Sequence, residues 1–372
     1  MKFIHLADLH LGRRVCGFSL IEEKDQKHIL DNIAEIIEEE NPRFMIIAGD
    51  VYDKLSPPVE AVTLLDEFLT ELSCKGLETF IIAGNHDSPE RIAFGASLMN
   101  KSGIHFSPIY NGRAERFTVA DEYGEVNIYL LPYLRTAEAR RFFPDEEIPD
   151  TAAAVSTAIK AMNIDTSRRN IIVSHQFVDG GEQSASERGA VGGTDGVPAE
   201  VYKDFDYAAL GHLHKPQAMK SERIRYGGTP LKYSVSEADQ KKCLTVCELG
   251  EKGTPVKVTL RELSPLRDMR VIEGSFNEIM SVSSDDFVEV HLTDTGRVPD
   301  AQKRLRAQYP HIMSVRYINE QERAPIEINE ESAARTASPL ELFEGFFAEA
   351  NGKNMTEEQR GYMRGMIEKI WG

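Results

Sequence analysis

Five stretches of the sequence each place metal-ligand side chains directly after a run of apolar residues. In chain order these side chains are Asp8 and His10, then Asp50 and Asp53 after Gly49, then Asn85, His86 and Asp87 after Gly84, then His175, and finally His212 and His214 after Gly211. A polar residue after one strand is usually ordinary loop. Five such endings, which contain half of the ten histidines, indicate one shared site.

The chemistry of these side chains favours a pair of divalent metal ions. Carboxylate and amide oxygens mixed with imidazole nitrogens suit Mn²⁺, Fe²⁺ or Zn²⁺, and the lack of thiolate ligands disfavours a structural zinc. The ligands are too many for one ion, and a central carboxylate can bridge two, as in phosphoryl-transfer sites. We therefore assign one ion to Asp8, His10 and His214, and the other to Asn85, His175 and His212, with Asp50 shared.

His86 is left over from this set of ligands. A histidine beside such a site can protonate a leaving alkoxide or stabilise charge in the transition state. Asp53 or Asp87 could hold its second ring nitrogen. The alternative role for His86 is that of a structural group behind the ligands. The other histidines fall outside the pattern: His5, His28, His105, His291 and His311.

The elements that position these residues follow from the apolar runs. The runs have the pattern of buried strands and lie within Phe3–Leu11, Phe44–Asp53, Thr79–Asp87, Asn170–His175 and Tyr207–His214. Open α/β sheets bind ligands at the carboxyl ends of their strands. The five strand endings are therefore predicted to meet at one edge.

Helical patterns separate the strands and complete a layered fold. An amphipathic helix is predicted over 22–40, a second from Ser56-Pro57 to about Gly76, and a third capped by Ser88-Pro89-Glu90. Further along, two strands lie within 116–134, an alanine-rich helix lies over 150–162, and 223–249 adds strands to a second sheet. The predicted fold class is α/β, with two layers of sheet flanked by helices.

The C-terminal third has a different organisation. Residues 266–320 alternate strands and short helices and predict a small α+β module without a metal-ligand cluster, whereas residues 1–265 form the catalytic domain. A polar, acidic linker over 321–337 leads to two helices within 338–372, the second with a capping box at Thr356-Glu-Glu-Gln359. The large apolar residues of these helices pack on the body or, as their position favours, dock a partner.

Composition limits the partners and the location. With 43 basic and 60 acidic residues the formal charge is -17, which argues against nucleic-acid binding by a general basic surface. The sequence has no apolar run of about 20 residues and no signal-peptide pattern, so we expect a cytoplasmic protein with no membrane association. Cys16, Cys74, Cys243 and Cys247 are expected to be ordinary thiols, and the glycine-rich stretch 180–196 is expected to be a surface loop rather than a substrate-contacting one.

The five motifs resemble those of the calcineurin-like metallophosphoesterases. Within that superfamily, the segments DLHLG, GDVYD followed by PP, GNHDS, ALGHLHKPQ and RYGGTP are similar to the SbcD family, from Met1 to about Glu248. The resemblance implies a Mn²⁺-dependent DNA nuclease, a 3'-to-5' exonuclease on double strands and an endonuclease on single strands and hairpins, acting in DNA repair and recombination. It also implies a homodimer within a heterotetramer with SbcC, an ABC-type ATPase. By order and pattern, 266–318 corresponds to the DNA-capping domain and the terminal helices to the SbcC-binding tail.

Two other functions use the same residues. One is a phosphatase or phosphodiesterase acting on small nucleotide substrates, which would not need the extra module or the apolar tail. The other is a scaffold with a vestigial metal site. The presence of a suitable side chain at every ligand position argues against this alternative. The sequence therefore favours the nuclease.

Overall fold

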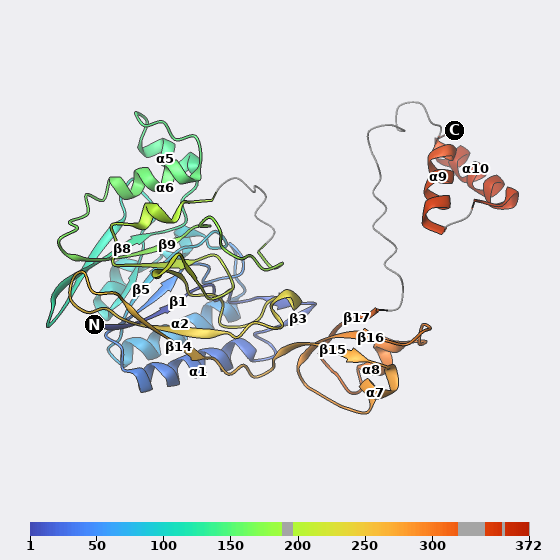
Figure 1. Ribbon diagram of the computed structural model, residues 1–372, viewed down its shortest axis with the longest axis horizontal. Helices are drawn as coiled ribbons and strands as arrows, with labels where there is room; N and C mark the ends of the chain where they lie inside the picture. Colours follow the sequence, from blue (N-terminus) through green and yellow to red (C-terminus); the bar gives the residue numbers. More distant parts are fainter. Residues whose placement is uncertain (188–195, 319–338, 352–353, 372) are drawn as a thin grey trace. The chain divides into compact units, whose positions relative to one another are not determined.

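The computed structural model describes residues 1–187, 196–318, 339–351 and 354–371 (Figure 1). The chain divides into two compact units. The larger contains Met1–Ile272, Ser283–Val290 and Gln302–Ser314, and the smaller contains Glu273–Val282, His291–Ala301 and the described part of Val315–Gly372. All of the predicted metal ligands belong to the larger unit.

The first sheet of the larger unit has six strands in the order β14-β13-β1-β4-β5-β6. Its parallel strands are β1 (Lys2–Leu6), β4 (Phe44–Ala48), β5 (Glu78–Ile82) and β6 (Ile104–Phe106). Beyond β1 follow two antiparallel strands, β13 (Cys243–Glu248) and β14 (Lys257–Glu262). The sequence predicted that all strands of 223–249 join the second sheet, and this is wrong for β13. It pairs with the open edge of β1, with Lys2 opposite Glu248.

The second sheet also has six strands, in the order β11-β12-β10-β9-β8-β7. Its parallel strands are β8 (Gly124–Leu131), β9 (Arg169–His175), β10 (Tyr207–Gly211) and β12 (Ser221–Tyr226). The antiparallel strands at its edges are β7 (Glu115–Asp121) and β11 (Gln217–Met219). The predicted strand pair within 116–134 is confirmed as β7 and β8.

The two sheets pack face to face around one apolar layer. Phe3 stacks on Phe44 with ring centroids 4.9 Å apart, and Tyr207 of the second sheet meets Phe3 edge-on at 5.4 Å. Outside this layer, α1 (Asp25–Glu40) and α2 (Val59–Cys74) cover the first sheet (Figure 1). The second sheet is covered by α5 (Thr136–Phe142) and α6 (Thr151–Lys160). The predicted two-sheet sandwich flanked by helices is confirmed.

Short elements and helix starts differ in detail from the sequence pattern. Helix α2 starts at Val59 with Pro58 as its N-cap, later than Ser56-Pro57, because Pro58 disfavours helical geometry in the residue before it. The predicted Ser88 cap does begin α3 (Pro89–Ile92), where its hydroxyl accepts from Arg91 N. The remaining short elements are β2 (Arg14–Val15), β3 (Phe18–Ser19), α4 (Ala96–Met99), η1 (Asn100–Ser102), η2 (Ala199–Tyr202) and η3 (Val235–Glu237).

The C-terminal elements follow the predicted order. They are β15 (Met269–Gly274), α7 (Phe276–Met280), β16 (Phe287–Leu292), α8 (Ala301–Leu305) and β17 (Ile312–Tyr317), with a three-stranded sheet in the order β15-β16-β17. Helices α9 (Pro339–Asn351) and α10 (Glu357–Trp371) follow, and the Thr356–Gln359 capping box is present. The linker 321–337, Ser338 and residues 188–195 of the glycine-rich loop lie outside the described residues. Among the helices described, none is both long and apolar enough to cross a membrane.

Candidate metal centre

The two sheets bring the five strand endings to one place in the larger unit. Backbone and side-chain hydrogen bonds join the loops: Asp8 N donates to Gly49 O at 3.0 Å, and His10 N donates to Asp50 O at 2.9 Å. Asp8 Oδ1 in turn accepts from His212 N at 2.9 Å, across 204 residues of sequence. These hydrogen bonds therefore fix the loops of the two sheets relative to one another.

One cluster of ligand atoms forms around Asn85. Its Oδ1 lies 3.0 Å from His175 Nε2 and 2.9 Å from His212 Nδ1, while Asp50 Oδ2 lies 3.2 Å from His175 Nε2. The other ring nitrogen of His175 lies 2.8 Å from Ala48 O, which can only accept. That nitrogen therefore carries a proton, and Nε2 is the nitrogen that faces the cluster and would bind a metal ion. These four residues are the set predicted for one ion.

The residues predicted for the second ion are less closely grouped: ligand atoms of His10, Asp53 and His86 lie within 4.8 Å of one another, as do those of Asp8, Asp50 and His175. His10 Nε2 lies 3.7 Å from Asp50 Oδ2, and the His10 and His214 rings have centroids 5.1 Å apart. Both ring nitrogens of His10 and Asp8 Oδ2 are buried and have no hydrogen-bond partner among the described residues. An unsatisfied buried polar atom costs about 1–3 kcal/mol, which a bound cation would remove. The residues present therefore fit two metal ions that meet at Asp50.

The charges of the cluster also favour cations. Burial raises the pKa of Asp8 well above its usual range, so two neighbouring carboxylates are hard to ionise together without positive charge. Burial opposes the ionisation of Asp50 too, but the charge of His175 outweighs it and holds that pKa below its usual range. Burial lowers the pKa of His212 to about 3, so this imidazole is neutral and can act as a ligand.

Four of the ligands sit on strained backbone. Asp8, His10, Asp50 and His212 have φ of 54°, 43°, 47° and 104°, a region that side chains rarely adopt. Each such residue costs on the order of 1–3 kcal/mol and persists only when its surroundings fix it. The interloop hydrogen bonds hold these loops in place, and the residues with strained backbone are the same ones that carry the predicted ligand side chains.

Glycines make room for the ligands. A methyl group at Gly211 would collide with the Ala48 carbonyl and lie 2.7 Å from His175 Nδ1. A methyl group at Gly84 would collide with the Asp50 carboxylate and backbone N. The glycine that precedes the ligand in each of these two motifs is therefore a packing requirement of the site.

Replacing Gly211 by alanine is expected to disrupt the metal centre. The methyl group must displace β4 or His175, which costs about 1–3 kcal/mol or more, and the chain should bind less divalent metal than the unaltered protein. Metal analysis and thermal unfolding of Gly211→Ala measure both effects. Gly296→Ala is the matched control because no atom lies within 4 Å of its added methyl group. Full metal content in Gly211→Ala would contradict this packing role.

His86 lies at the edge of the cluster. Its backbone N donates to Asp50 Oδ1 at 2.8 Å, and its ring is 4.8 Å from that of His10. Its Nδ1 lies 2.9 Å from the backbone carbonyl of Asp53, so Nδ1 donates and Nε2 is the nitrogen left to act on a substrate. Asp53 thus holds His86, but through its main chain rather than its carboxylate.

The other predicted holder of His86 has different contacts. The buried Asp87 carboxylate accepts from three backbone N–H groups, those of Val51, Tyr52 and Gly84, at 2.9–3.0 Å. These bonds join the β4 and β5 loops, so Asp87 positions the loops and not the His86 ring. The Asp53 carboxylate binds Arg13 Nη1 at 2.7 Å. Sequence reasoning missed Arg13, although it follows the first motif directly.

Comparisons with known proteins agree with this geometry. The model of the calcineurin-like phosphoesterase family matches residues 1–216, and that of the type 5 capsule protein repressor C-terminal domain matches residues 265–351. The D subunit of the SbcCD nuclease of Staphylococcus epidermidis is 32% identical over 324 residues, covering 85% of this chain and 85% of that protein.

Two solved structures are weaker matches. TT1561 of Thermus thermophilus is 12% identical, covers 70% of this chain and 98% of its own, and has a TM-score of 0.40. Yfce, a phosphoesterase from E. coli, is 12% identical, covers 67% of this chain and 88% of its own, and has a TM-score of 0.29. Scores this low add nothing about the fold. By its matching family model and its curated relative, the chain belongs to the calcineurin-like phosphoesterases and, within them, to the SbcD family.

Proposed function

We propose that this chain is the DNA nuclease subunit of an SbcCD-type complex and hydrolyses phosphodiester bonds with two Mn²⁺ ions. The observation that carries the proposal is the pair of buried ligand clusters that meet at Asp50, with unpartnered atoms on Asp8 and His10 among the described residues. Neither a scaffold nor a single-ion site needs two such clusters. The family, which the nuclease subunit of S. epidermidis represents, supports DNA as the substrate.

Each residue of the centre then has a role. Asp8, His10 and His214 would hold one ion, Asn85, His175 and His212 the other, and Asp50 both. Two bound ions would supply a deprotonated water and neutralise charge on the phosphate. His175 is kept in the correct tautomer by Ala48 O, and Asp87 fixes the loops. His86 donates Nδ1–H to the Asp53 carbonyl, and in its doubly protonated form it would donate Nε2–H to the leaving oxygen or to the phosphoryl group.

The proposal also divides the chain by task. Residues 1–265 form the nuclease domain, 266–320 the DNA-capping domain, 321–337 a linker, and 338–372 the tail that binds an SbcC-type ATPase in the cytoplasm. A C-terminal family model matching 265–351 supports a separate module after the nuclease domain. The net charge of -17 fits a subunit whose DNA contacts come largely from its partner.

A second copy of this chain is the proposed occupant of an apolar groove beside α2. The groove has a volume of about 390 Å³, and its wall includes Leu65, Leu69 and Phe106. Val62 and Phe94, which also line it, are 45% and 82% exposed. Exposed apolar residues gathered around a groove are typical of association surfaces, and SbcD-type subunits are expected to form homodimers.

The test of the function is a digestion of labelled linear duplex and hairpin DNA beside a panel of small nucleotides. We expect Mn²⁺-dependent cleavage of DNA that chelation reduces to background and added Mn²⁺ restores, because the bound ions would supply the attacking water. Asp50→Asn, which weakens both ion sites at once, serves as the inactive control. Hydrolysis of the nucleotides without cleavage of DNA would instead establish the small-substrate phosphodiesterase.

A further inference from the structure

The Nδ1 atom of His214 is enclosed by polar residues that the metal assignment does not use. His214 Nδ1 lies 2.8 Å from Ser186 Oγ and 3.4 Å from Glu237 Oε1. Ser186 Oγ also lies 2.6 Å from Glu237 Oε1. The three side chains form a short hydrogen-bonded chain that ends on a metal ligand.

The direction of these hydrogen bonds follows from counting protons. A serine hydroxyl has one hydrogen and a carboxylate has none, so Ser186 donates to Glu237 and must accept from His214. His214 therefore carries its proton on Nδ1. The lone pair is then on Nε2, the nitrogen available for a metal ion, so the chain selects the tautomer that a ligand needs.

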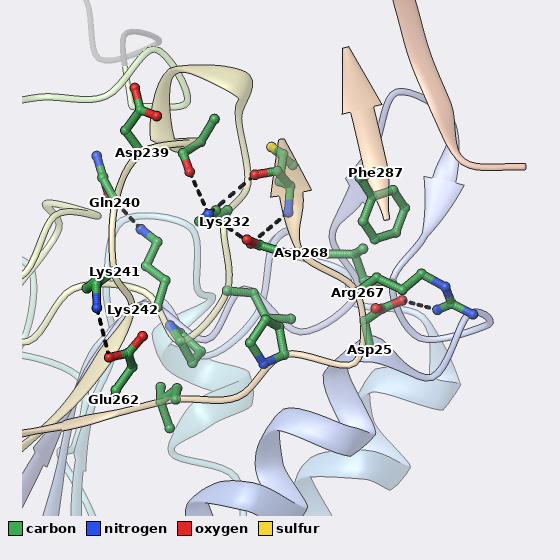
Figure 2. A pocket seen from close by; sticks show the side chains of 17 residues that line it. Asp25, Lys232, Asp239, Gln240, Lys241, Lys242, Glu262, Arg267, Asp268 and Phe287 are labelled. Carbon is green, nitrogen blue, oxygen red and sulfur yellow. Dashed lines mark hydrogen bonds and ion pairs between the residues drawn. The ribbon is translucent and has the colours of Figure 1, made fainter. Parts of the chain in front are cut away.

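Lys242 forms an ion pair with Glu237. Its Nζ donates to Glu237 Oε2 at 2.7 Å, to the His214 carbonyl at 2.9 Å and to Gln240 Oε1 at 2.9 Å. These three bonds use all three ammonium hydrogens. Figure 2 shows the contact with Gln240 in a cavity of about 290 Å³ that Lys242 helps to line. Hydrogen bonds therefore hold both carboxylate oxygens of Glu237 and the ammonium group of Lys242.

The ion pair is fully inside the protein. The Glu237 and Lys242 side chains are 0% and 4% exposed. Taking both charges out of water costs several kcal/mol per ion, and apolar replacements of such pairs are often neutral or stabilising. Stability alone therefore gives little reason for this pair, whereas the orientation of His214 gives one.

Residues before the undescribed part of the glycine-rich loop belong to the same network. The Glu187 carboxylate accepts from the backbone N of His214 and, at 2.8 Å, from Ser184 N. Ala185 N donates to Ser236 Oγ at 2.9 Å, which ties this segment to the one that carries Glu237. Residues 184–187, which the sequence assigned to a surface loop, therefore pack against a metal ligand.

We propose that Ser186, Glu237 and Lys242 are positioning residues that fix the tautomer and orientation of His214. The inference rests on the proposed metal site and adds residues from outside the five motifs to it. Loss of such a partner behind a metal ligand costs about 10- to 100-fold in metal affinity.

The test measures Mn²⁺ binding by calorimetry, which does not depend on nuclease activity. We expect two ions in the unaltered chain, and one of the two affinities about 10- to 100-fold weaker in Ser186→Ala and in Glu237→Gln. Ser186→Thr, which keeps the hydroxyl, should restore binding. Glu262→Gln is the matched control, since Glu262 forms an exposed pair with the neighbouring Lys241.

Glu237→Gln leaves a buried Lys242 charge without its partner and could unfold the protein. The double variant Glu237→Gln, Lys242→Met removes both charges, and we expect it to fold and still bind one ion weakly. Two-bond ¹H–¹⁵N spectra of the metal-free chain should show His214 as the Nδ1–H tautomer and a shift away from it in Ser186→Ala.

The outcomes separate this inference from the proposed function. Two ions bound with unchanged affinity in Ser186→Ala and in the double variant would overturn the positioning role alone. Failure of the unaltered chain to bind two ions would overturn the proposed function and this inference with it.

Discussion

Replacing His86 by alanine is expected to lower phosphodiester cleavage by about 10²–10⁴-fold while two metal ions stay bound. The reason is geometric. His86 hydrogen-bonds to the ligand set through its backbone N, which donates to Asp50 and survives the substitution. What the variant loses is the ring, whose Nδ1–H is donated to Asp53 O and whose Nε2 is the atom proposed to act on the substrate.

The leaving group distinguishes the two roles of His86. A proton donor matters most for an alkoxide, as in DNA, and least for a stable anion such as p-nitrophenolate. If His86 protonates the leaving oxygen, His86→Ala should lower the rate of DNA cleavage far more than the rate of hydrolysis of bis-p-nitrophenyl phosphate. If the ring stabilises charge on the phosphoryl group, both substrates should suffer equally.

The control for this variant is His28→Ala, which changes a histidine on α1 outside the site, bound to the Ser264 carbonyl. It should keep both activity and metal. Unchanged cleavage of DNA by His86→Ala would refute a catalytic role. A loss of metal along with activity would instead show that His86 is a structural group behind the ligands.

Removing residues 338–372 is expected to abolish co-purification with the SbcC-type ATPase and to leave Mn²⁺-dependent hydrolysis of a model phosphodiester intact. Helices α9 and α10 contact each other, and Arg360 of α10 pairs with Glu344 of α9. Each still exposes large apolar side chains: Phe346 is 49%, Tyr362 70% and Met366 41% exposed. Such a surface on two short helices fits a partner groove.

Single substitutions make this prediction sharper than the deletion does. Tyr362→Ala removes a large aromatic contact, for which about 2 kcal/mol or roughly 30-fold weaker binding is expected. Glu358→Ala, on the same helix, is the matched control and should bind normally. Retention of the ATPase by the chain without residues 338–372 would show that the tail is not the binding site.

Local features of the sequence were enough for much of this architecture. Each strand ending carries its own candidate ligands, as β10 does with His212 and His214, so these residues could be listed without knowing how the strands pack. Capping boxes such as Thr356–Gln359 also involve only residues three apart. These features could be predicted because the strand pattern, the helix caps and the ligand chemistry each depend on residues only a few positions apart.

The same sequence was misleading where partners are distant. Strand β13 joined the first sheet because β1 had an open edge, which only the packed sheets reveal. Asp87 appeared suited to hold the His86 ring next to it, but in the fold it accepts from the backbone of residues 51 and 52. Alternative hydrogen-bond partners compete in three dimensions, and adjacency in sequence does not decide among them.

By itself, then, the sequence determined which residue types gather at the strand ends, and from their chemistry it predicted two cations. Only the tertiary structure decided the left-handed backbone of Asp8 and Asp50, the closeness of Gly211 to Ala48, and the pairing of His214 with Ser186 and Glu237. The physical reason is range. Ligand identity is a property of single side chains, whereas backbone strain, close packing and hydrogen-bond direction arise from contacts between distant segments, such as that of Asp8 with His212, which are 204 residues apart.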